Sequence, residues 1–383
     1  MVIIGAGYAG VMAANRIAGD QRMQGSVSVT VLNPVADFVE KIRLHEVAAG
    51  SRESAFVPMR SLLHERVVMV EGTASRVDPE RRRVHLTGDP MPLEYDLLLY
   101  AVGSTHEQSN VPTGAFALTS HDDADRLRAR LFRLDPGSVI SVVGAGLTGI
   151  EVAAEIAEQH PRLAVRLLSR GRIAEHLSEP GRRAITQRLS ALRVEMMENT
   201  DVQRCDTSSI QRSDGTSLGS ACTVWTVGLS APSLARDSGL PTDSRGRLLV
   251  DESLRCLRYP DIFGAGDAIR APEAVAGHLR MSCATALPLG AHAADSILAR
   301  LDGRTPVPLS AGYMLTCISL GRRSGLVQAV RADDRPRGVI LKGRLAGMTK
   351  AQVCRMTLSW IRSELRRSGS YSWPKGPQPA EAR

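Results

Sequence analysis

The first 33 residues show the hydrophobic pattern of a strand, a turn, a helix and a second strand. Residues 2–4 form a short apolar run, and apolar positions at helical spacing occupy 11–18. The β-branched run 26–32 then predicts another strand. A helix between two such strands is typical of a parallel βαβ unit.

The same pattern returns in the middle of the chain. Residues 139–143 predict a buried strand, 150–159 a helix and 164–168 a further strand. The turns of the two units begin at Gly5 and Gly144, about one domain length apart. We therefore expect an α/β protein that contains two copies of one unit.

Each turn carries the pattern GxGxxG, as GAGYAG at 5–10 and GAGLTG at 144–149. The first glycine permits a tight turn, the second lets the backbone approach a pyrophosphate, and the third lets helix and strand pack closely. The following helix presents free N–H groups and the positive end of its dipole to the phosphates. Because each copy follows a strand and opens a helix, two dinucleotide sites are predicted, the alternative being turns without a ligand.

Five motifs in residues 1–300 resemble those of the two-dinucleotide-binding flavoproteins of the pyridine nucleotide–disulfide reductase superfamily. They are GAGYAG at 5–10, AVGS at 101–104, GAGLTGIE at 144–151, TVG at 226–228 and FGAGDA at 263–268. The chain is most similar to the branch without a redox disulfide, the type II NADH dehydrogenase-like oxidoreductases. The resemblance implies Rossmann-like FAD and NAD(P) domains and transfer of hydride from NAD(P)H to the flavin.

On this basis the chain divides into three parts. Residues 1–118 and 232–304 are expected to form the FAD-binding domain, and residues 119–231 the NAD(P)H-binding domain between them. Residues 305–383 follow a Pro/Gly-rich linker as a small C-terminal module.

The resemblance also implies which residues bind the cofactors. The first glycine motif and the Gly-Asp motif would hold FAD, with Asp267 at its ribityl and phosphate region, the alternative being an ordinary turn aspartate. The second glycine motif would hold NAD(P)H. The expected cofactor-binding residues are Gly5, Gly7, Tyr8, Ala9, Gly10, Asn33, Lys41, Gly103, Gly144, Gly146, Gly149, Ser169, Arg170, Arg172, Gly228, Gly266 and Asp267.

Both units depart from the usual pattern at the end of the second strand, where an acidic residue binds the ribose hydroxyls. The first unit has Asn33 there, and an amide still hydrogen-bonds a ribose. The second has Ser169, Arg170 and Arg172 and no carboxylate. A serine and two arginines suit a 2′-phosphate, which predicts a preference for NADPH, unless these arginines are solvated surface charges.

Lys41 and Glu151 are the candidate catalytic residues. Relatives place a lysine beside the flavin, and Lys41 is one of only four lysines in a chain with 44 arginines. Glu151 lies in the first turn of the helix that opens at the second glycine motif. We expect the two to form an ion pair beside flavin N5. The alternative is that Glu151 complements the helix dipole while Lys41 is solvated, with Arg43 as the substitute cation.

The six cysteines contain no CxxC or CxxxxC, which argues against a zinc cluster and a redox disulfide and favours a reduced, cytosolic protein. The nine histidines show no metal-ligand spacing, so no metal is expected.

Residues 280–290 lack the glutamines that type II NADH dehydrogenases carry in the quinone-site wall. Cys283 lies in this stretch, either facing the flavin or buried and inert. The electron acceptor is therefore open: a quinone, a small organic molecule, a protein carrier or oxygen.

The net charge of +8 is concentrated at the C-terminus, where residues 335–383 hold eleven basic and two acidic side chains. The remainder is near neutral, so nucleic-acid binding is not expected. Thr349 is the expected N-cap of a basic amphipathic helix. Its apolar face would comprise Cys354, Leu358, Ile361 and Leu365. Such a helix suits peripheral contact with an anionic membrane, the alternative being packing on the body or across a homodimer.

After Ser368, a disordered tail is expected. The chain opens directly on a strand, and no apolar run is long enough to span a bilayer. We therefore expect a cytoplasmic protein with peripheral contact at the inner face of the membrane. The predicted function is that of an FAD-dependent NAD(P)H oxidoreductase that passes electrons to a quinone or small organic acceptor. The alternatives are a flavoenzyme acting on a specialised metabolite and a redox-sensing flavoprotein that binds a partner.

Overall fold

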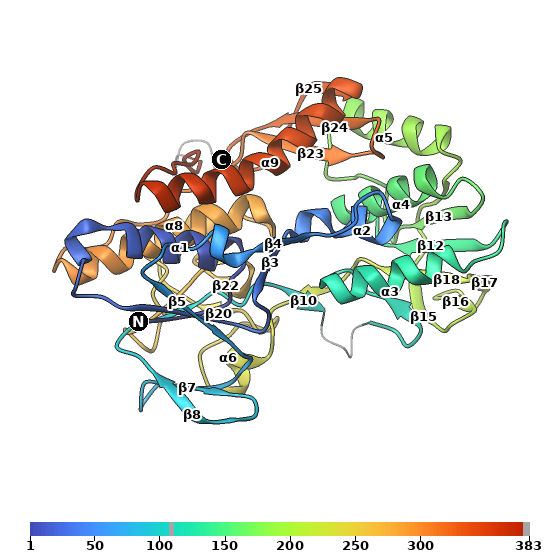
Figure 1. Cartoon of the computed structure of the whole chain (residues 1–383). Coiled ribbons are helices and arrows are strands. Elements are labelled where there is room, and N and C mark those ends of the chain that lie inside the picture. Colours follow the sequence, from blue (N-terminus) through green and yellow to red (C-terminus); the bar gives the residue numbers. More distant parts are fainter. Residues whose placement is uncertain (107–110, 378–383) are drawn as a thin grey trace.

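Two parallel sheets organise the part of the chain that the computed structural model describes, residues 1–106 and 111–377. Each sheet has five strands and carries helices on its faces (Figure 1). This is the predicted α/β class with two doubly wound units and a smaller C-terminal module.

The first sheet has the strand order β21-β9-β1-β2-β5, all parallel. Its strands are β1 (Val2–Ile4), β2 (Val29–Asn33), β5 (Val67–Glu71), β9 (Leu98–Tyr100) and β21 (Ile262–Gly264). The central strand β1 is apolar throughout and buried, as a strand with covered faces requires. Helices α1 (Tyr8–Gly19) and α8 (Cys283–Leu301) pack against each other beside this sheet.

The second sheet has the order β11-β18-β12-β13-β14, again all parallel. Its strands are β11 (Ala115–Phe116), β12 (Val139–Val143), β13 (Ala164–Leu168), β14 (Glu195–Met197) and β18 (Cys222–Trp225). The helices of this unit are α3 (His121–Phe132), α4 (Leu147–Gln159) and α5 (Glu179–Ala191). The domain boundaries stay a prediction, but β11 pairs in the second sheet although it precedes the expected boundary at 118/119.

Short additional sheets and helices accompany the two units. The sheets are β3 (Asp37–Val39) with β4 (Phe56–Pro58); β6 (Ala74–Asp78), β7 (Arg83–Leu86) and β8 (Asp89–Glu94); β10 (Thr105–His106) with β19 (Leu229–Ser230); and β15 (Val202–Cys205), β16 (Ser209–Arg212) and β17 (Ser217–Gly219). β20 (Leu248–Leu249) and β22 (Ile269–Arg270) form a parallel pair. The short helices are α2 (Leu44–Ala49), α6 (Leu234–Asp237) and α7 (Glu273–Ala276).

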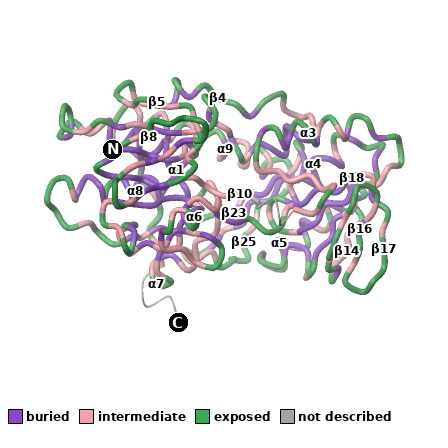
Figure 2. The backbone as a smooth tube through the Cα atoms, turned by 90° about the horizontal axis from the view of Figure 1, so that it is seen from below, coloured by how far each residue is buried: buried purple, intermediate pink, exposed green. Residues whose placement is uncertain are grey.

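Helix α2 belongs to the N-terminal part of the chain but packs into the second hydrophobic core. Leu44 and Val47 are fully buried there, together with Ile150 and Ile156 of α4. Figure 2 shows the buried segments in two groups, one around α1 and α8 and the other around α4 and β18. The contact of α2 with α4 therefore joins the two units close to the second glycine motif.

The C-terminal module is an antiparallel meander followed by one long helix. It comprises β23 (Leu315–Ser319), β24 (Gly325–Val330), β25 (Pro336–Gly343) and α9 (Arg344–Arg366). The helix begins at Arg344, directly after β25, so the predicted N-cap at Thr349 is wrong. The Thr349 hydroxyl instead donates to the Leu345 carbonyl, as a threonine inside a helix does.

The face of α9 that was predicted to be apolar packs on the body, mainly against α1 and β24. Cys354 and Ile361 are buried on this face, while Leu358 and Leu365 lie half-buried at its edge. Glu364 is also fully buried, because its carboxylate pairs with Arg16 of α1 at 2.8 Å. The alternative of packing on the body is therefore confirmed for this face.

Residues 369–377 pack against the protein, which corrects the predicted disordered tail as far as residue 377. Arg16 donates to the Tyr371 carbonyl at 2.7 Å, and the Tyr371 side chain is buried. The Trp373 indole donates to the Ser310 carbonyl at 2.9 Å. These aromatic side chains add buried area that a count of Gly, Ser and Pro residues ignores. Residues 378–383 lie outside the described residues.

None of the helices within 1–106 and 111–377 combines the length and hydropathy that crossing a bilayer requires.

Candidate functional site

The first glycine motif forms a backbone cradle at the start of α1. A Cβ added at Gly10 would lie 1.9 Å from the Gly5 carbonyl oxygen, and one added at Gly5 would lie 2.4 Å from the Ala101 carbonyl oxygen. A Cβ at Gly7 would meet no atom within 4 Å. Gly7 is also the N-cap of α1 and supplies no side-chain cap, so the first N–H groups of the helix are free for a ligand. These residues fit the pyrophosphate of a dinucleotide.

The second glycine motif repeats this geometry at the start of α4. A Cβ at Gly149 would lie 1.8 Å from the Gly144 carbonyl oxygen, whereas one at Gly146 would meet nothing within 4 Å. The N-cap Gly146 again provides no side-chain cap. Gly103 and Gly228, in the loops after β9 and β18, have φ values of 72° and 81° and open space on their Cβ side.

Tyr8 and Ala9 lie in the first turn of α1 and are both buried. The Tyr8 ring meets Phe38 edge-on, with 5.0 Å between the ring centroids. A Cβ at Gly290 would lie 2.2 Å from the Ala9 carbonyl oxygen, so α8 crosses α1 at close range beside the cradle. Tyr8 and Ala9 therefore form the side of the cradle that packs against the protein.

Asn33 ends β2 as predicted and holds the first glycine turn. Its side-chain oxygen accepts from the Ala6 N–H at 2.9 Å, and its amide nitrogen donates to the Val35 carbonyl at 2.8 Å. Ribose recognition by Asn33 stays a prediction.

Asp267 lies at the centre of a polar group that includes Lys41. Its two carboxylate oxygens accept from the Ser104 hydroxyl at 2.7 Å and from the Ser282 N–H at 3.0 Å. Lys41 donates to the Ser104 carbonyl at 3.0 Å. Burial raises the pKa of Asp267, against the effects of the Ser104 hydroxyl, Lys41 and the Ser282 N–H. Gly266, at a φ of 76°, turns the chain so that Asp267 follows the end of β21.

The predicted ion pair between Lys41 and Glu151 is wrong. Glu151 Oε1 lies 3.0 Å from Lys350 Nζ on α9 and accepts from the Ser319 N–H of β23 at 2.9 Å. Lys41 is directed to Ser104 instead, because it opens a short 3-10 turn next to the loop after β9. Arg43, the alternative cation, pairs with Glu46 at 2.8 Å. The sequence alone does not indicate that the C-terminal module reaches the start of α4.

Lys350 is the functional candidate that the sequence analysis missed. Like Lys41, it is one of only four lysines in this chain, and this rarity could have identified it as a candidate. Burial opposes the charge on Lys350, but Glu151, together with the Cys354 and Cys283 side chains, raises the pKa of the ammonium. Burial likewise opposes the charge on Glu151, but Lys350, His45 and the Ser319 N–H together lower the pKa of that carboxyl. Both groups are therefore held in their charged forms in a mostly buried site.

Three thiols border this ion pair, on Cys283, Cys317 and Cys354. Lys350 donates to the Cys317 carbonyl at 3.2 Å, and Cys354 lies one helical turn from Lys350. Burial raises the pKa of the Cys283 thiol to about 12, although Lys350 opposes the shift. A thiol with this pKa is protonated at neutral pH, which supports the inert alternative for Cys283.

The loop after β13 contains the predicted adenosine-end residues. Ser169 is buried and Arg170 is exposed, with no ion pair to any described residue. Arg172 Nη2 lies 3.6 Å from Glu179. A Cβ at Gly171 would lie 3.0 Å from the Glu175 carboxylate, so an acidic group that the strand-end rule does not identify also reaches this loop.

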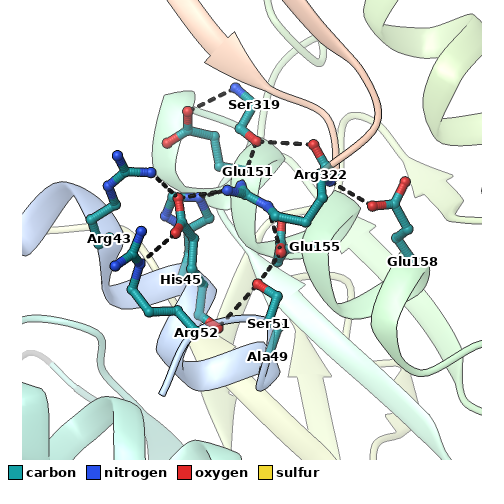
Figure 3. A network of polar contacts seen from close by, with 12 residues as sticks. Arg43, His45, Ala49, Ser51, Arg52, Glu151, Glu155, Glu158, Ser319 and Arg322 are labelled. Atoms are coloured by element: carbon teal, nitrogen blue, oxygen red, sulfur yellow. Dashed lines mark hydrogen bonds and ion pairs between the residues drawn. The ribbon is translucent and has the colours of Figure 1, made fainter. Parts of the chain in front are cut away.

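A wider polar network surrounds His45 between α2, α4 and the β23–β24 turn (Figure 3). Its central residue is Arg322, whose guanidinium contacts carboxylates of both helices. The network lies next to the Glu151–Lys350 pair, since Ser319 is common to both. The arrangement provides two anion-binding helix starts and one buried ion pair beside the second.

Comparison with known proteins agrees with this geometry. Residues 1–282 match the profile of the pyridine nucleotide-disulphide oxidoreductase family. An NADH dehydrogenase-like protein of Mycobacterium tuberculosis is 29% identical over 378 residues, covering 92% of each chain. A type II NADH:quinone oxidoreductase of the same organism is 30% identical over 352 residues, covering 80% of this chain and 73% of its own.

Two solved structures share the fold. The NDH2 of Plasmodium falciparum, solved with NADH, has a TM-score of 0.79 at 16% identity and covers 97% of this chain and 98% of its own. The sulfide:quinone oxidoreductase of Aquifex aeolicus has a TM-score of 0.77 at 15% identity, with coverages of 95% and 91%. With two glycine cradles, a Gly-Asp turn and a profile match over most of its length, the chain belongs to the pyridine nucleotide-disulphide oxidoreductase family and is an FAD-dependent oxidoreductase.

Proposed function

We propose that the protein oxidises NAD(P)H and passes the electrons to a quinone. The observation that carries this proposal is the mostly buried Lys350–Glu151 pair at the start of α4. Cys283 begins α8 next to Ser282, whose N–H donates to Asp267. Lys350 and Asp267 both act electrostatically on the Cys283 thiol. We propose that the acceptor is held beside the Lys350–Glu151 pair, on the side of the Asp267 group. The similarity to type II NADH:quinone oxidoreductases supports the same acceptor class.

The chain's residues have separate tasks in this proposal. The free N–H groups of α1 and α4 bind the pyrophosphates of FAD and NAD(P)H. FAD, when bound, supplies hydride acceptance and onward electron transfer. Lys350 provides a fixed positive charge where negative charge develops on the acceptor oxygen, and Glu151 orients the ammonium. Because Glu151 raises the pKa of Lys350, this ammonium acts as an electrostatic stabiliser rather than as a proton donor.

The acceptor is tested by stopped-flow reoxidation of the NAD(P)H-reduced enzyme. Water-soluble quinones, ferricyanide, a protein electron carrier and oxygen are compared at equal concentrations. A quinone is expected to give the fastest second-order reoxidation. If every acceptor is as slow as oxygen, the quinone proposal fails and a redox-sensing role is favoured. Fast reoxidation by a small non-quinone compound alone would favour a specialised metabolite as the substrate.

NADPH is proposed as the preferred reductant. Arg170 is exposed and free of ion pairs within the described residues, and Arg172 has only a distant carboxylate partner at 3.6 Å. Both guanidiniums are therefore available for a 2′-phosphate. Glu175 opposes the preference for NADPH, because a carboxylate near this loop suits the free ribose hydroxyls of NADH.

Peripheral membrane contact is proposed to use β25 and the first turn of α9, because the predicted face of α9 is covered. Val339, Leu341, Leu345 and Met348 are all exposed there, and Lys342 and Arg344 lie among them. Exposed apolar side chains between basic ones suit an anionic bilayer surface. Co-sedimentation with anionic vesicles, compared with a Leu345→Ser/Met348→Ser variant, tests this. The cytoplasmic location and the homodimer stay predictions.

A further inference from the structure

Arg322 connects three segments that are far apart in the sequence (Figure 3). Its Nη1 lies 2.6 Å from Glu46 Oε1 on α2, and its Nε lies 2.8 Å from Glu155 Oε1 on α4. Its Nη2 donates to the Ser319 hydroxyl at 2.7 Å and lies 3.4 Å from His45 Nε2. The backbone N–H of Arg322 also donates to Glu158 at 2.5 Å. One planar guanidinium thus serves four partners in fixed directions.

The carboxylates that Arg322 contacts depend on it to different degrees. Glu46 also pairs with Arg43 at 2.8 Å and with Arg52 at 2.7 Å. Glu155 is fully buried, and among the described residues Arg322 is its one ion-pair partner. The Ser51 hydroxyl adds a hydrogen bond to Glu155. Removal of Arg322 would leave the Glu155 carboxylate buried without a cation, which is costly.

Ser319 connects this network to the ion pair of the site. Its hydroxyl accepts from Arg322 and donates to the Gly321 carbonyl at 3.2 Å, so the β23–β24 turn has a fixed shape. Its backbone N–H donates to Glu151 Oε1, the same oxygen that lies 3.0 Å from Lys350 Nζ. The direction of the Ser319 N–H therefore bears directly on the Glu151 carboxylate.

We propose that Arg322 is a positioning residue for the Lys350–Glu151 pair, acting through Ser319 and fixing α4 against α2 through Glu155 and Glu46. This inference rests on the proposed function only in assigning the pair a role in electron transfer to the acceptor. A lysine cannot replace this arginine, because its single ammonium cannot reach two carboxylates and a hydroxyl in one plane. The geometry of these contacts therefore requires an arginine at position 322 and not only a positive charge.

Loss of the Ser319 N–H bond has a defined effect on Glu151. The titratable groups that face Glu151 are Lys350 and Cys354 on α9, Cys283 at the start of α8, Cys317 on β23 and His45 on α2. Burial raises the pKa of Glu151, and Lys350, His45 and the Ser319 N–H lower it. Without a well-directed Ser319 N–H, the pKa of Glu151 rises. The acid limb of any rate that needs ionised Glu151 then moves to higher pH.

The variants Arg322→Lys and Ser319→Ala test the inference, with Arg323→Gln as the matched control. Arg322→Lys keeps the charge that folding requires, and Ser319→Ala keeps the N–H but removes the hydroxyl contact. Arg323 is exposed in the same turn and has no ion pair within the described part of the chain. Reoxidation of the reduced holoenzyme by a soluble quinone is followed as a function of pH. Both test variants are expected to move the acid limb up by at least about half a unit, whereas Arg323→Gln should not move it.

A second measurement does not depend on activity. The unfolding midpoints of the holoenzyme are compared for Arg322→Lys, Glu151→Gln and the double variant. Because Arg322 acts on Glu151, the two losses in midpoint should be less than additive by more than about 2 °C. A strictly additive cycle together with an unmoved acid limb would overturn the inference.

The outcomes also separate this inference from the proposed function. If the wild-type enzyme is reoxidised by quinone with an acid limb that Glu151→Gln abolishes, the function stands, and an unmoved limb in Arg322→Lys rejects only the positioning role. If quinone does not reoxidise the wild type, the proposed function fails. A less-than-additive cycle would then still support the physical link from Arg322 to Glu151, and an additive one would reject it.

Discussion

Lys350 Nζ lies 3.0 Å from Glu151 Oε1, which joins the C-terminal helix α9 to the second turn of α4. The contact brings a residue of the smallest part of the chain to the start of the second dinucleotide-binding unit. Neither side chain is more than 17% exposed, so the pair is mostly shielded from water. A charge pair shielded in this way acts more strongly on a neighbouring reacting group than a solvated one.

Replacement of Lys350 by methionine should slow reoxidation by quinone about 10-fold or more, a barrier increase of about 1.4 kcal/mol. The reason is the loss of the positive charge proposed to face the acceptor oxygen. FAD content should stay close to one per chain, because the hydrogen bond and ion pair of Lys350 go to Cys317 and Glu151 and not to the Asp267 group. Stopped-flow absorbance with a soluble quinone measures the rate.

Lys342→Met is the control for this variant, since Lys342 is an exposed lysine in the same module. It should leave the rate unchanged. A Lys350→Met enzyme that reacts as fast as the wild type would remove Lys350 from the site.

Asp267→Ala should lose most of the bound FAD. Its carboxylate accepts from the Ser104 hydroxyl and the Ser282 N–H, and so orders both loops at the end of the first sheet. Alanine leaves these part-buried donors without a partner, which costs up to about 1–3 kcal/mol for each. The ratio of flavin to protein absorbance reports occupancy. Ser104→Ala, which removes one of the two donors, should show an intermediate loss, and full occupancy in Asp267→Ala would disprove the Gly-Asp assignment.

The sequence predicted the two parallel units and both glycine cradles because these depend on local signals. Gly7 and Gly146 lie at βα turns that any parallel unit of this type repeats, and their open Cβ sides follow from the motif. The pairing of Lys41 with Glu151 failed for the opposite reason. Which cation reaches Glu151 depends on how α9 packs on α1, and Glu364, buried against Arg16, has no apolar signal that predicts this packing.

Arg170→Glu together with Arg172→Glu should reverse the cofactor preference. One charge-assisted contact to a 2′-phosphate contributes about 1.5–3 kcal/mol, so the wild type should favour NADPH by roughly 10- to 100-fold in kcat/KM for flavin reduction. The double variant presents carboxylates that repel the phosphate and should favour NADH. Glu175→Gln should increase the wild-type preference for NADPH, because it removes a negative charge beside Gly171. A wild-type enzyme that uses NADH equally well or better would contradict the assignment.

His45 should make the fold less stable as the pH falls from about 6.5 to about 4. Burial lowers the pKa of His45 to about 4, although Glu151 and Glu46 oppose the shift. Below pH 6.5 the unfolded chain takes up a proton that the folded chain refuses, so the free energy of unfolding decreases with falling pH. The loss is about 1.4 kcal/mol per unit and about 3 kcal/mol over the whole window, and it ends once folded His45 is protonated as well. Chemical unfolding of the wild type and of His45→Gln at pH 6.5, 5.5 and 4.5 measures this contribution as the difference between their slopes. Glutamine can still accept from Arg322 but does not titrate, so its slope should be smaller, and identical slopes would show that His45 is not held neutral in the fold.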